Sequence, residues 1–254
     1  MKNIFLLSLI FILLFSCDHK GPGKRYPIEQ THGHGHGHND NNHHEHHGEE
    51  HSSLGVNNPI KDIASSEDNA FASAKRDLWQ RPDLIIPHLG NMENKTMADI
   101  GAGPVGYFSF IVAWHTKVKK VLALDIDKKA IDDIEQTKIK KRDILGDRIE
   151  TRLVKPNDPL LEKNEVDVIL ISSTLTYIDD KIAYLNNLRE KLPVSGRLVI
   201  VDYKMKEIPE IFPPRSERIP LFEMEELVDK AGFKRIVTDD ISLDFQYIIV
   251  ALKP

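Results

Sequence analysis

Asp99-Ile-Gly-Ala-Gly-Pro-Val-Gly106 lies between a short apolar run and a stretch whose apolar residues recur at helical spacing. In such a strand–turn–helix context each glycine has a separate use. Gly101 permits the tight turn, Gly103 lets a ligand approach the backbone, and Gly106 allows the helix to pack closely on the strand. The segment therefore predicts a ligand-binding turn between a strand and a helix.

An acidic residue follows this turn at an informative distance. Asp125 ends the next apolar run, 19 residues after Gly106. A carboxylate at the end of the second strand can accept hydrogen bonds from both hydroxyls of an adenosine ribose. The turn and the acid together favour an adenosine-bearing ligand. The alternative is an ordinary strand-to-helix turn beside a solvated Asp125.

Strand-like and helical patterns alternate along the rest of the domain, and alternation of this kind predicts a parallel sheet covered on both faces. The last two strand-like runs have no helix between them, which predicts an antiparallel hairpin at one edge. The fold class is therefore α/β, a Rossmann-like doubly wound sheet of seven strands. The strand-like runs are 96–100, 121–124, 149–154, 166–171, 197–201, 234–237 and 245–252, and the helical stretches are 105–115, 130–142, 178–192 and 221–231.

The composition separates a globular domain from an unusual N-terminal region. The 254 residues are 41% hydrophobic and 29% charged, which excludes a wholly disordered or multi-pass membrane chain. A net charge of -5 argues against nucleic acid as a partner. With one cysteine, no disulfide can form within the chain. Ten of the twelve histidines lie in the first 51 residues.

Residues 1–17 have the pattern of an export signal. Lys2 precedes an apolar stretch from Ile4 to Phe15, which as a helix would rise about 18 Å, against roughly 30 Å for a hydrocarbon core. The segment is thus typical of a signal peptide. Its end, Leu14-Phe-Ser-Cys17, resembles a bacterial lipoprotein signal, which implies a lipid on Cys17, a membrane anchor and a location in the cell envelope. A plain signal peptide or an uncleaved anchor is the alternative.

Residues 18–60 have few large apolar side chains, so we predict a flexible tether before a folded domain at residues 61–254. Neutral imidazole binds Zn, Ni and Cu, and alternating glycines let several rings reach one ion. The tether is therefore either a metal-binding or buffering segment or a solvated spacer. Its candidate ligands are His32, His34, His36, His38, His43, His44, His46 and His47.

Over residues 70 to 254 the domain resembles class I S-adenosylmethionine-dependent methyltransferases. The motif from Asp99 to Gly106, the acid after the second strand and the Leu192-Pro-x-x-Gly196 turn agree with that family in order and spacing. Upstream, Arg76-x-x-Trp79-Gln80-x-Pro82 resembles a helix that lies over the cofactor in one branch of the family. The resemblance implies that S-adenosylmethionine is the cofactor and that it is held by Asp99, Gly101, Ala102, Gly103, Gly106, Asp125, Ile126, Asn157, Asp158, Ser172 and Ser173.

The resemblance implies methyl transfer to a small-molecule acceptor, which the sequence does not identify. A nicotinamide-dependent oxidoreductase shares the turn but usually has an apolar residue where Asp99 stands, and we expect no second domain that would hold a hydride acceptor. The sequence leaves two alternative functions open: an envelope protein that binds an adenosyl metabolite without turnover, and an envelope protein that buffers metal ions. No catalytic residue is assigned. Possible proton acceptors near the expected site are Tyr107, His115, Tyr177, Asp202 and Tyr203.

Overall fold

The computed structural model describes residues 76–208 and 213–254. The signal, Cys17 and the histidine tether lie outside these residues. The chain divides into two compact units, Met1–Ser52 and Ser53–Pro254, and every described residue belongs to the second. Within the described ranges, none of the helices has the length and apolar character needed to cross a membrane.

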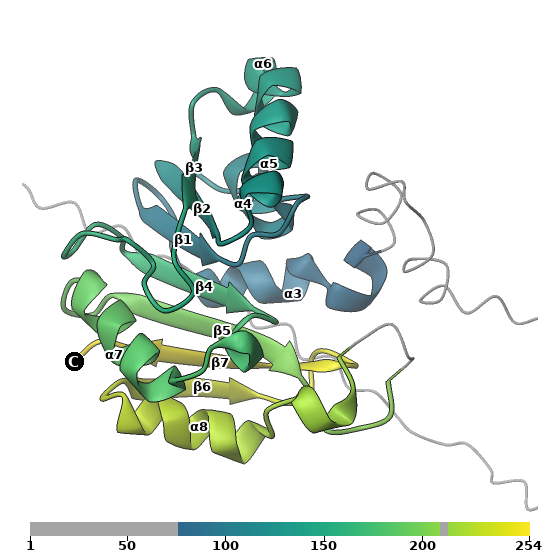
Figure 1. Cartoon of the computed structure of the whole chain (residues 1–254), viewed down its shortest axis with the longest axis vertical. Coiled ribbons are helices and arrows are strands. Elements are labelled where there is room, and N and C mark those ends of the chain that lie inside the picture. Colours follow the sequence, from purple (N-terminus) through teal and green to yellow (C-terminus); the bar gives the residue numbers. More distant parts are fainter. Residues whose placement is uncertain (1–75, 209–212) are drawn as a thin grey trace, which may run out of the picture. The chain divides into compact units, whose positions relative to one another are not determined.

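The second unit is built on one seven-stranded sheet with the order β3-β2-β1-β4-β5-β7-β6 (Figure 1). All strand pairs are parallel except those of β7, which runs antiparallel to both β5 and β6. The predicted fold class and terminal hairpin are therefore confirmed, with β7 inserted inside the sheet and β6 at its edge. The strands are β1 (Thr96–Ile100), β2 (Lys120–Asp125), β3 (Ile149–Leu153), β4 (Val168–Ser172), β5 (Arg197–Tyr203), β6 (Lys234–Asp239) and β7 (Gln246–Leu252).

Helices cover both faces of this sheet because its central strands are apolar on both sides. One core cluster joins α4 (Tyr107–His115) and α5 (Lys128–Lys140) to residues such as Met97 and Val199. The other joins α7 (Lys181–Lys191) and α8 (Leu221–Lys230) to the alternate residues of the same strands, such as Ile100 and Ile200. Alternation along each strand thus divides the apolar side chains between two cores.

Two aspartates set the starts of the long helices. Asp127 accepts a hydrogen bond from Lys129 N at the start of α5, and Asp180 accepts one from Ala183 N at the start of α7. Helix α7 therefore begins at Lys181, later than the predicted 178. The shorter elements are α3 (Pro82–Ile85), η1 (Ile86–Leu89), α6 (Arg142–Leu145), η2 (Leu175–Tyr177) and η3 (Arg215–Glu217), and residues 76–80 are also helical.

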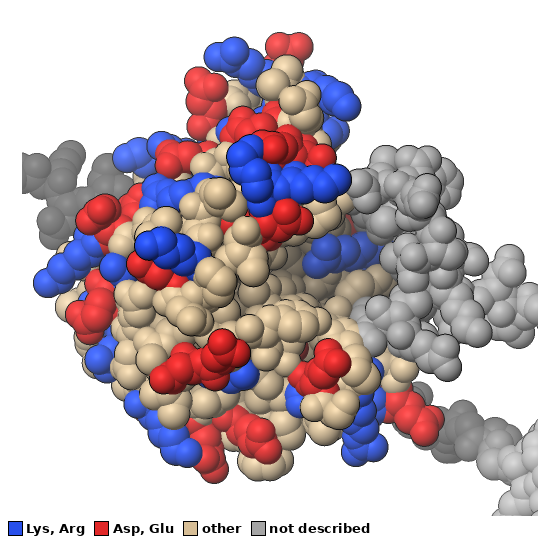
Figure 2. Space-filling model, viewed as in Figure 1, with Lys and Arg blue, Asp and Glu red and all other residues tan. Residues whose placement is uncertain are grey.

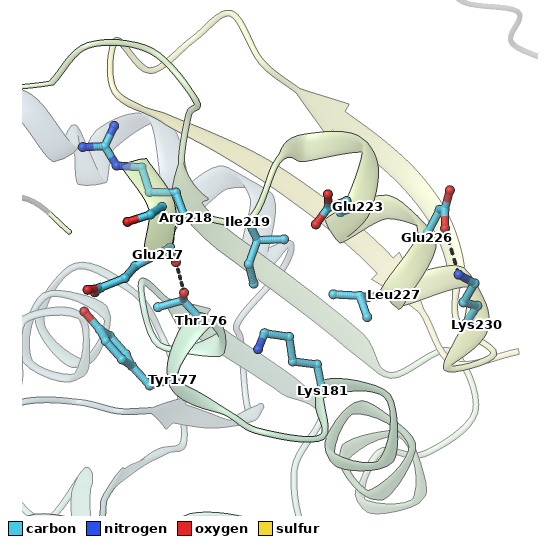
Figure 3. Close-up of a pocket in the computed structure, with 11 residues that line it drawn as sticks. Thr176, Tyr177, Lys181, Glu217, Arg218, Ile219, Glu223, Glu226, Leu227 and Lys230 are labelled. Atoms are coloured by element: carbon cyan, nitrogen blue, oxygen red, sulfur yellow. Dashed lines mark hydrogen bonds and ion pairs between the residues drawn. The ribbon is translucent and has the colours of Figure 1, made fainter. Parts of the chain in front are cut away.

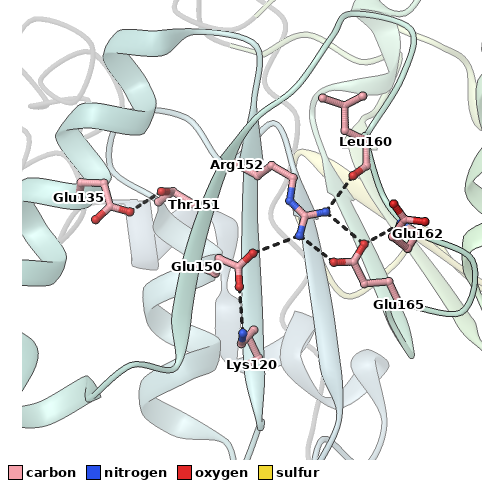
Figure 4. A network of polar contacts seen from close by, with 8 residues as sticks. All are labelled: Lys120, Glu135, Glu150, Thr151, Arg152, Leu160, Glu162 and Glu165. Carbon is pink, nitrogen blue, oxygen red and sulfur yellow. Dashed lines mark hydrogen bonds and ion pairs between the residues drawn. The ribbon is translucent and has the colours of Figure 1, made fainter.

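An arginine on edge strand β3 ties down the connection to β4 (Figure 4). Arg152 donates to both carboxylate oxygens of Glu165, at 3.1 and 2.7 Å, and to the carbonyl of Leu160 at 2.8 Å. It also donates to Glu150, which accepts from Lys120 as well. Bidentate pairs of this kind add geometric precision. The network therefore fixes the loop that carries Asp158.

Candidate functional site

The glycine turn joins β1 to α4 at the carboxyl edge of the parallel strands. Gly101, Gly103 and Gly106 all have positive φ, at 71°, 68° and 54°, which favours glycine. A side chain on Gly101 would collide with Thr174 in the loop after β4, whereas one on Gly103 would have no neighbour within 4 Å. Gly103 is therefore the point at which a ligand can approach the backbone.

The N–H groups of this turn are used within the protein. Gly101 N and Ala102 N both donate to the carbonyl of Leu124, at 2.8 and 3.0 Å, and Gly103 N donates to Asp125. The turn therefore offers a ligand close backbone approach, rather than the unpaired amides of a phosphate-binding loop.

Asp125 connects the turn to the end of β2. Its Oδ2 accepts from Gly103 N at 2.8 Å and its Oδ1 accepts from Asp127 N at 2.9 Å. Each carboxylate oxygen can accept a further hydrogen bond. The neighbouring Ile126 is 59% exposed, which leaves an apolar surface beside this carboxylate. An acceptor next to an apolar platform suits a ribose and a base.

Asp99 lies on β1 with its side chain in the interior. Ser109 Oγ on α4 donates to its Oδ2 at 2.7 Å, and burial raises the pKa of Asp99 to about 6. Arg76 is the cation that acts on it. The Arg76 guanidinium lies 4.1 Å from the centroid of the Tyr107 ring, and its burial lowers its pKa. The start of the described chain thus places a cation beside the acid of the turn.

The remaining predicted cofactor residues lie on two further loops. Asn157 is exposed and Asp158 is half-buried in a tight turn after β3, where Asp158 accepts from Leu160 N at 2.9 Å. Ser172 ends β4, and Ser173 follows it with a positive φ of 55°. All the predicted residues lie at the C-terminal ends of β1, β2 and β4 or in the loops after β1, β2, β3 and β4, so they share the carboxyl edge of the sheet.

Two buried glutamines hydrogen-bond to the side chains of Ser172 and Ser173, and neither glutamine was predicted as a site residue. Gln80 Nε2 donates to Ser172 Oγ at 3.0 Å, and Gln246 Nε2 donates to Ser173 Oγ at 2.9 Å. Gln80 belongs to the upstream motif that the sequence singled out. Gln246 begins the last strand, and no sequence signal marks it, because its hydrogen-bond partner Ser173 is 73 residues away along the chain.

The possible proton acceptors have unlike environments. His115 is exposed and stacks on Trp114, with ring centroids 6.0 Å apart. Tyr107 donates to Asp77, and Tyr203 is buried and stacks on Trp79 at 6.4 Å. Asp202 is buried at the end of β5, and burial raises its pKa to about 6.

A groove of about 600 Å³ opens beside these strand ends (Figure 3). It lies between η2, the start of α7, the segment 216–219 and α8, and Tyr177 and Lys181 line it. Acidic and basic side chains are interspersed over the face drawn in Figure 2, around a mostly uncharged hollow. In residues 76–208 and 213–254, no three His, Cys, Asp or Glu side chains are placed to hold a metal ion.

Comparison with solved structures shows the same fold in several proteins. A SAM-dependent methyltransferase from Aquifex aeolicus is 21% identical, with a TM-score of 0.64 over 77% of this chain and 98% of that one. The [4+2]-cyclase SpnF is 15% identical, with a TM-score of 0.60 over 69% and 80%. Haemonchus contortus phosphoethanolamine N-methyltransferase 2, solved with S-adenosyl-L-methionine, is 16% identical, with a TM-score of 0.57 over 69% and 53%.

Comparison with curated protein sequences found no match. A family profile described as a methyltransferase domain matches residues 91–238, a range that contains the glycine turn, Asp125, the serine pair and the groove. Sequence pattern, sheet order and site geometry agree with this match. The chain therefore belongs to the methyltransferase-domain family.

Proposed function

We propose that residues 61–254 bind S-adenosylmethionine at the carboxyl edge of β1, β2 and β4 and transfer its methyl group to a small-molecule acceptor. One observation carries this proposal: Gly103 is open on one side and its N–H donates to Asp125, a buried carboxyl group that interacts electrostatically with a second one, Asp99. An open glycine beside two carboxyl groups suits a ligand with an amino acid at one end and a ribose at the other.

The described residues divide among the parts of such a ligand. Asp99 would accept from the amino group of the methionine portion, and Arg76 would lie near its carboxylate. Asp125 would accept from the ribose hydroxyls, with Ile126 and Asp158 beside the adenine. A bound sulfonium supplies an electrophilic methyl group, so the protein's main task is alignment. Ser172 and Ser173 would border that methyl group.

Calorimetry of the full chain with S-adenosylmethionine and S-adenosylhomocysteine tests the proposal. We expect Asp125→Ala to weaken both affinities at least tenfold, because the ribose loses its acceptor and Gly103 N loses its partner. Asp132→Ala is the matched control, since Asp132 is an exposed aspartate paired with Lys128 on α5. No binding by the parent chain, or equal affinity in Asp125→Ala, contradicts the proposal.

Binding without methyl transfer is a second candidate, because the same fold occurs in the [4+2]-cyclase. Release of S-adenosylhomocysteine during incubation with candidate acceptors separates the two. Tight binding without release of that product on any acceptor favours the second candidate.

For the N-terminal region we propose lipidation of Cys17, attachment to the membrane of the cell envelope, and Zn, Ni or Cu binding by the histidine tether. The apolar run that ends at the single cysteine supports the first two, and ten histidines within 51 residues support the third. Titration of the full chain with Zn²⁺ or Ni²⁺ tests metal binding, and the absence of saturable binding would exclude it.

A further inference from the structure

Asp202 at the tip of β5 has a carboxylate oxygen without a partner. The residue is 1% exposed, and its Oδ1 accepts from Tyr203 N at 2.8 Å, whereas Oδ2 has no hydrogen-bond partner among the described residues. Gln246 Oε1 on the neighbouring strand is a second buried acceptor that has no hydrogen-bond partner among the described residues. Buried polar atoms are nearly always paired, so an unpaired carboxylate oxygen needs a physical explanation.

The Asp202 side chain lies on the sheet face that borders the groove. Its partner across the strands is Tyr247, whose hydroxyl donates to the carbonyl of Ile219 at 2.9 Å, and Ile219 lines the groove. Two other groove residues, Lys181 and Tyr177, interact electrostatically with Asp202. The unpaired oxygen therefore faces the layer of side chains that forms the groove.

The groove is joined to the proposed cofactor site by one short loop. Thr174, in that loop, lies directly against Gly101 of the glycine turn. Tyr177 follows three residues later, and its N–H donates to the carbonyl of Thr174 at 3.0 Å. A molecule in the groove would therefore lie beside the serine end of the cofactor site.

The polar groups of the groove favour a ligand that donates hydrogen bonds. Its basic groups already have partners: Lys181 Nζ donates to the carbonyl of Ile178, and Lys230 pairs with Glu226. Arg218 donates to the carbonyls of Pro213, Lys204 and Lys206. The carboxylates of Glu217 and Glu223 line the same groove (Figure 3), and no ion pair involves them within the described ranges. Together with the unpaired oxygen of Asp202, these carboxylates give the groove more hydrogen-bond acceptors without a partner than donors without one.

We propose that this groove binds the methyl-accepting substrate, and that the substrate is a small amine whose N–H donates to Asp202 Oδ2 after entry past Tyr177. The inference rests on the function proposed above, because it assigns the acceptor side of that site. An alkylammonium group would supply both the missing hydrogen and a charge opposite to that of the carboxylates. Transfer of its N–H proton to Asp202 Oδ2 would free the nitrogen lone pair, which forms the N–CH3 bond as the S–CH3 bond breaks and S-adenosylhomocysteine leaves. Asp202 does not itself line the groove, and Tyr177 is a lining residue that interacts with it electrostatically, so rotation of the Tyr177 side chain would open the route.

Calorimetry with two probes of equal shape tests this assignment. The full chain, saturated with S-adenosylhomocysteine at pH 7.5, is titrated with phenethylamine and with neutral 2-phenylethanol. We expect the amine to bind at least tenfold more tightly than the alcohol. Asp202→Asn should abolish that preference, while Asn keeps an acceptor for Tyr203 N–H. Asp132→Asn, which alters an exposed aspartate on α5 outside the groove, should retain it.

The pH dependence gives a second readout. The groups that face Asp202 are Lys181 from α7, Tyr177 from η2, Tyr247 from β7 and Tyr203 from its own strand. Burial raises the pKa values of the three tyrosines, so they stay protonated between pH 5 and 7.5, and the part of the loss of amine affinity that Asp202→Asn removes reports Asp202. With a pKa of about 6 for Asp202, we expect affinity to fall roughly tenfold by pH 5.

Each result decides between the two proposals. If S-adenosylhomocysteine does not bind, both the proposed function and this assignment fail. If it binds but neither probe does, or if Asp202→Asn retains the preference for the amine, only the assignment is overturned. Melting temperature and S-adenosylhomocysteine affinity show whether the variant is folded.

Discussion

At the scale of single residues, the two buried carboxyl groups make stability depend on pH. Burial raises the pKa values of Asp99 and Asp202 from 3.8 to about 6. An acid whose pKa is raised by folding binds its proton more tightly in the folded state, so its ionisation destabilises the protein. This loss of folding stability begins as pH rises above 3.8 and is complete above about 6. For each group it is on the order of 3 kcal/mol.

Asp202→Asn should therefore stabilise the protein at pH 7.5 by about 1–3 kcal/mol and have little effect near pH 4. Ion-paired carboxylates such as Glu165, whose pKa is lowered by Arg152, change stability in the opposite direction. The informative quantity is thus the difference in urea unfolding free energy between variant and parent at each pH. If that free-energy difference is the same at pH 4 and pH 7.5, ionisation of Asp202 does not destabilise the folded protein, and this prediction is wrong.

At the scale of secondary-structure elements, the glycine turn is where β1, α4 and the loop after β4 meet. Gly101→Ala should destabilise the domain by about 2–4 kcal/mol, because alanine is strained at positive φ and its Cβ would strike Thr174. Gly103→Ala carries only the backbone strain, about 1–2 kcal/mol, but its methyl group would enter the ligand's space. We expect melting temperature to fall more in Gly101→Ala. Cofactor affinity should fall in Gly103→Ala even when the protein is fully folded. Equal melting temperatures for the two variants would contradict this contrast.

At the scale of the whole molecule, the anchor and the folded domain should act independently. In a bacterial host, Cys17→Ser should abolish incorporation of labelled palmitate and move the protein from the membrane to the soluble fraction, because two or more acyl chains are needed for stable attachment. S-adenosylmethionine affinity should be unchanged, since the proposed site lies within residues 61–254. A parent chain that takes up no palmitate, or a variant that stays in the membrane fraction, contradicts lipidation.

Local patterns predicted the elements but not all of their ends. Strand β1 has the predicted bounds because an apolar run of only five residues before the glycine turn is too short for a helix and is buried as a central strand. Helix α7 begins later than predicted because Leu175–Tyr177 form a separate helical turn and Asp180 supplies the cap. Apolar periodicity cannot distinguish these two cases, because Ile178 is buried whether or not it is helical.

The amino-acid sequence was enough to establish the α/β alternation, the glycine turn with its following acid, and the contrast between the histidine-rich segment and the folded domain. These features depend on residue spacing over fewer than thirty positions, where backbone geometry dominates. The insertion of β7 between β5 and β6, the contact of Gln246 with Ser173 and the unpaired oxygen of Asp202 required the three-dimensional structure. They depend on which distant strands pair and which buried groups then find partners, and both are set by packing of the whole sheet.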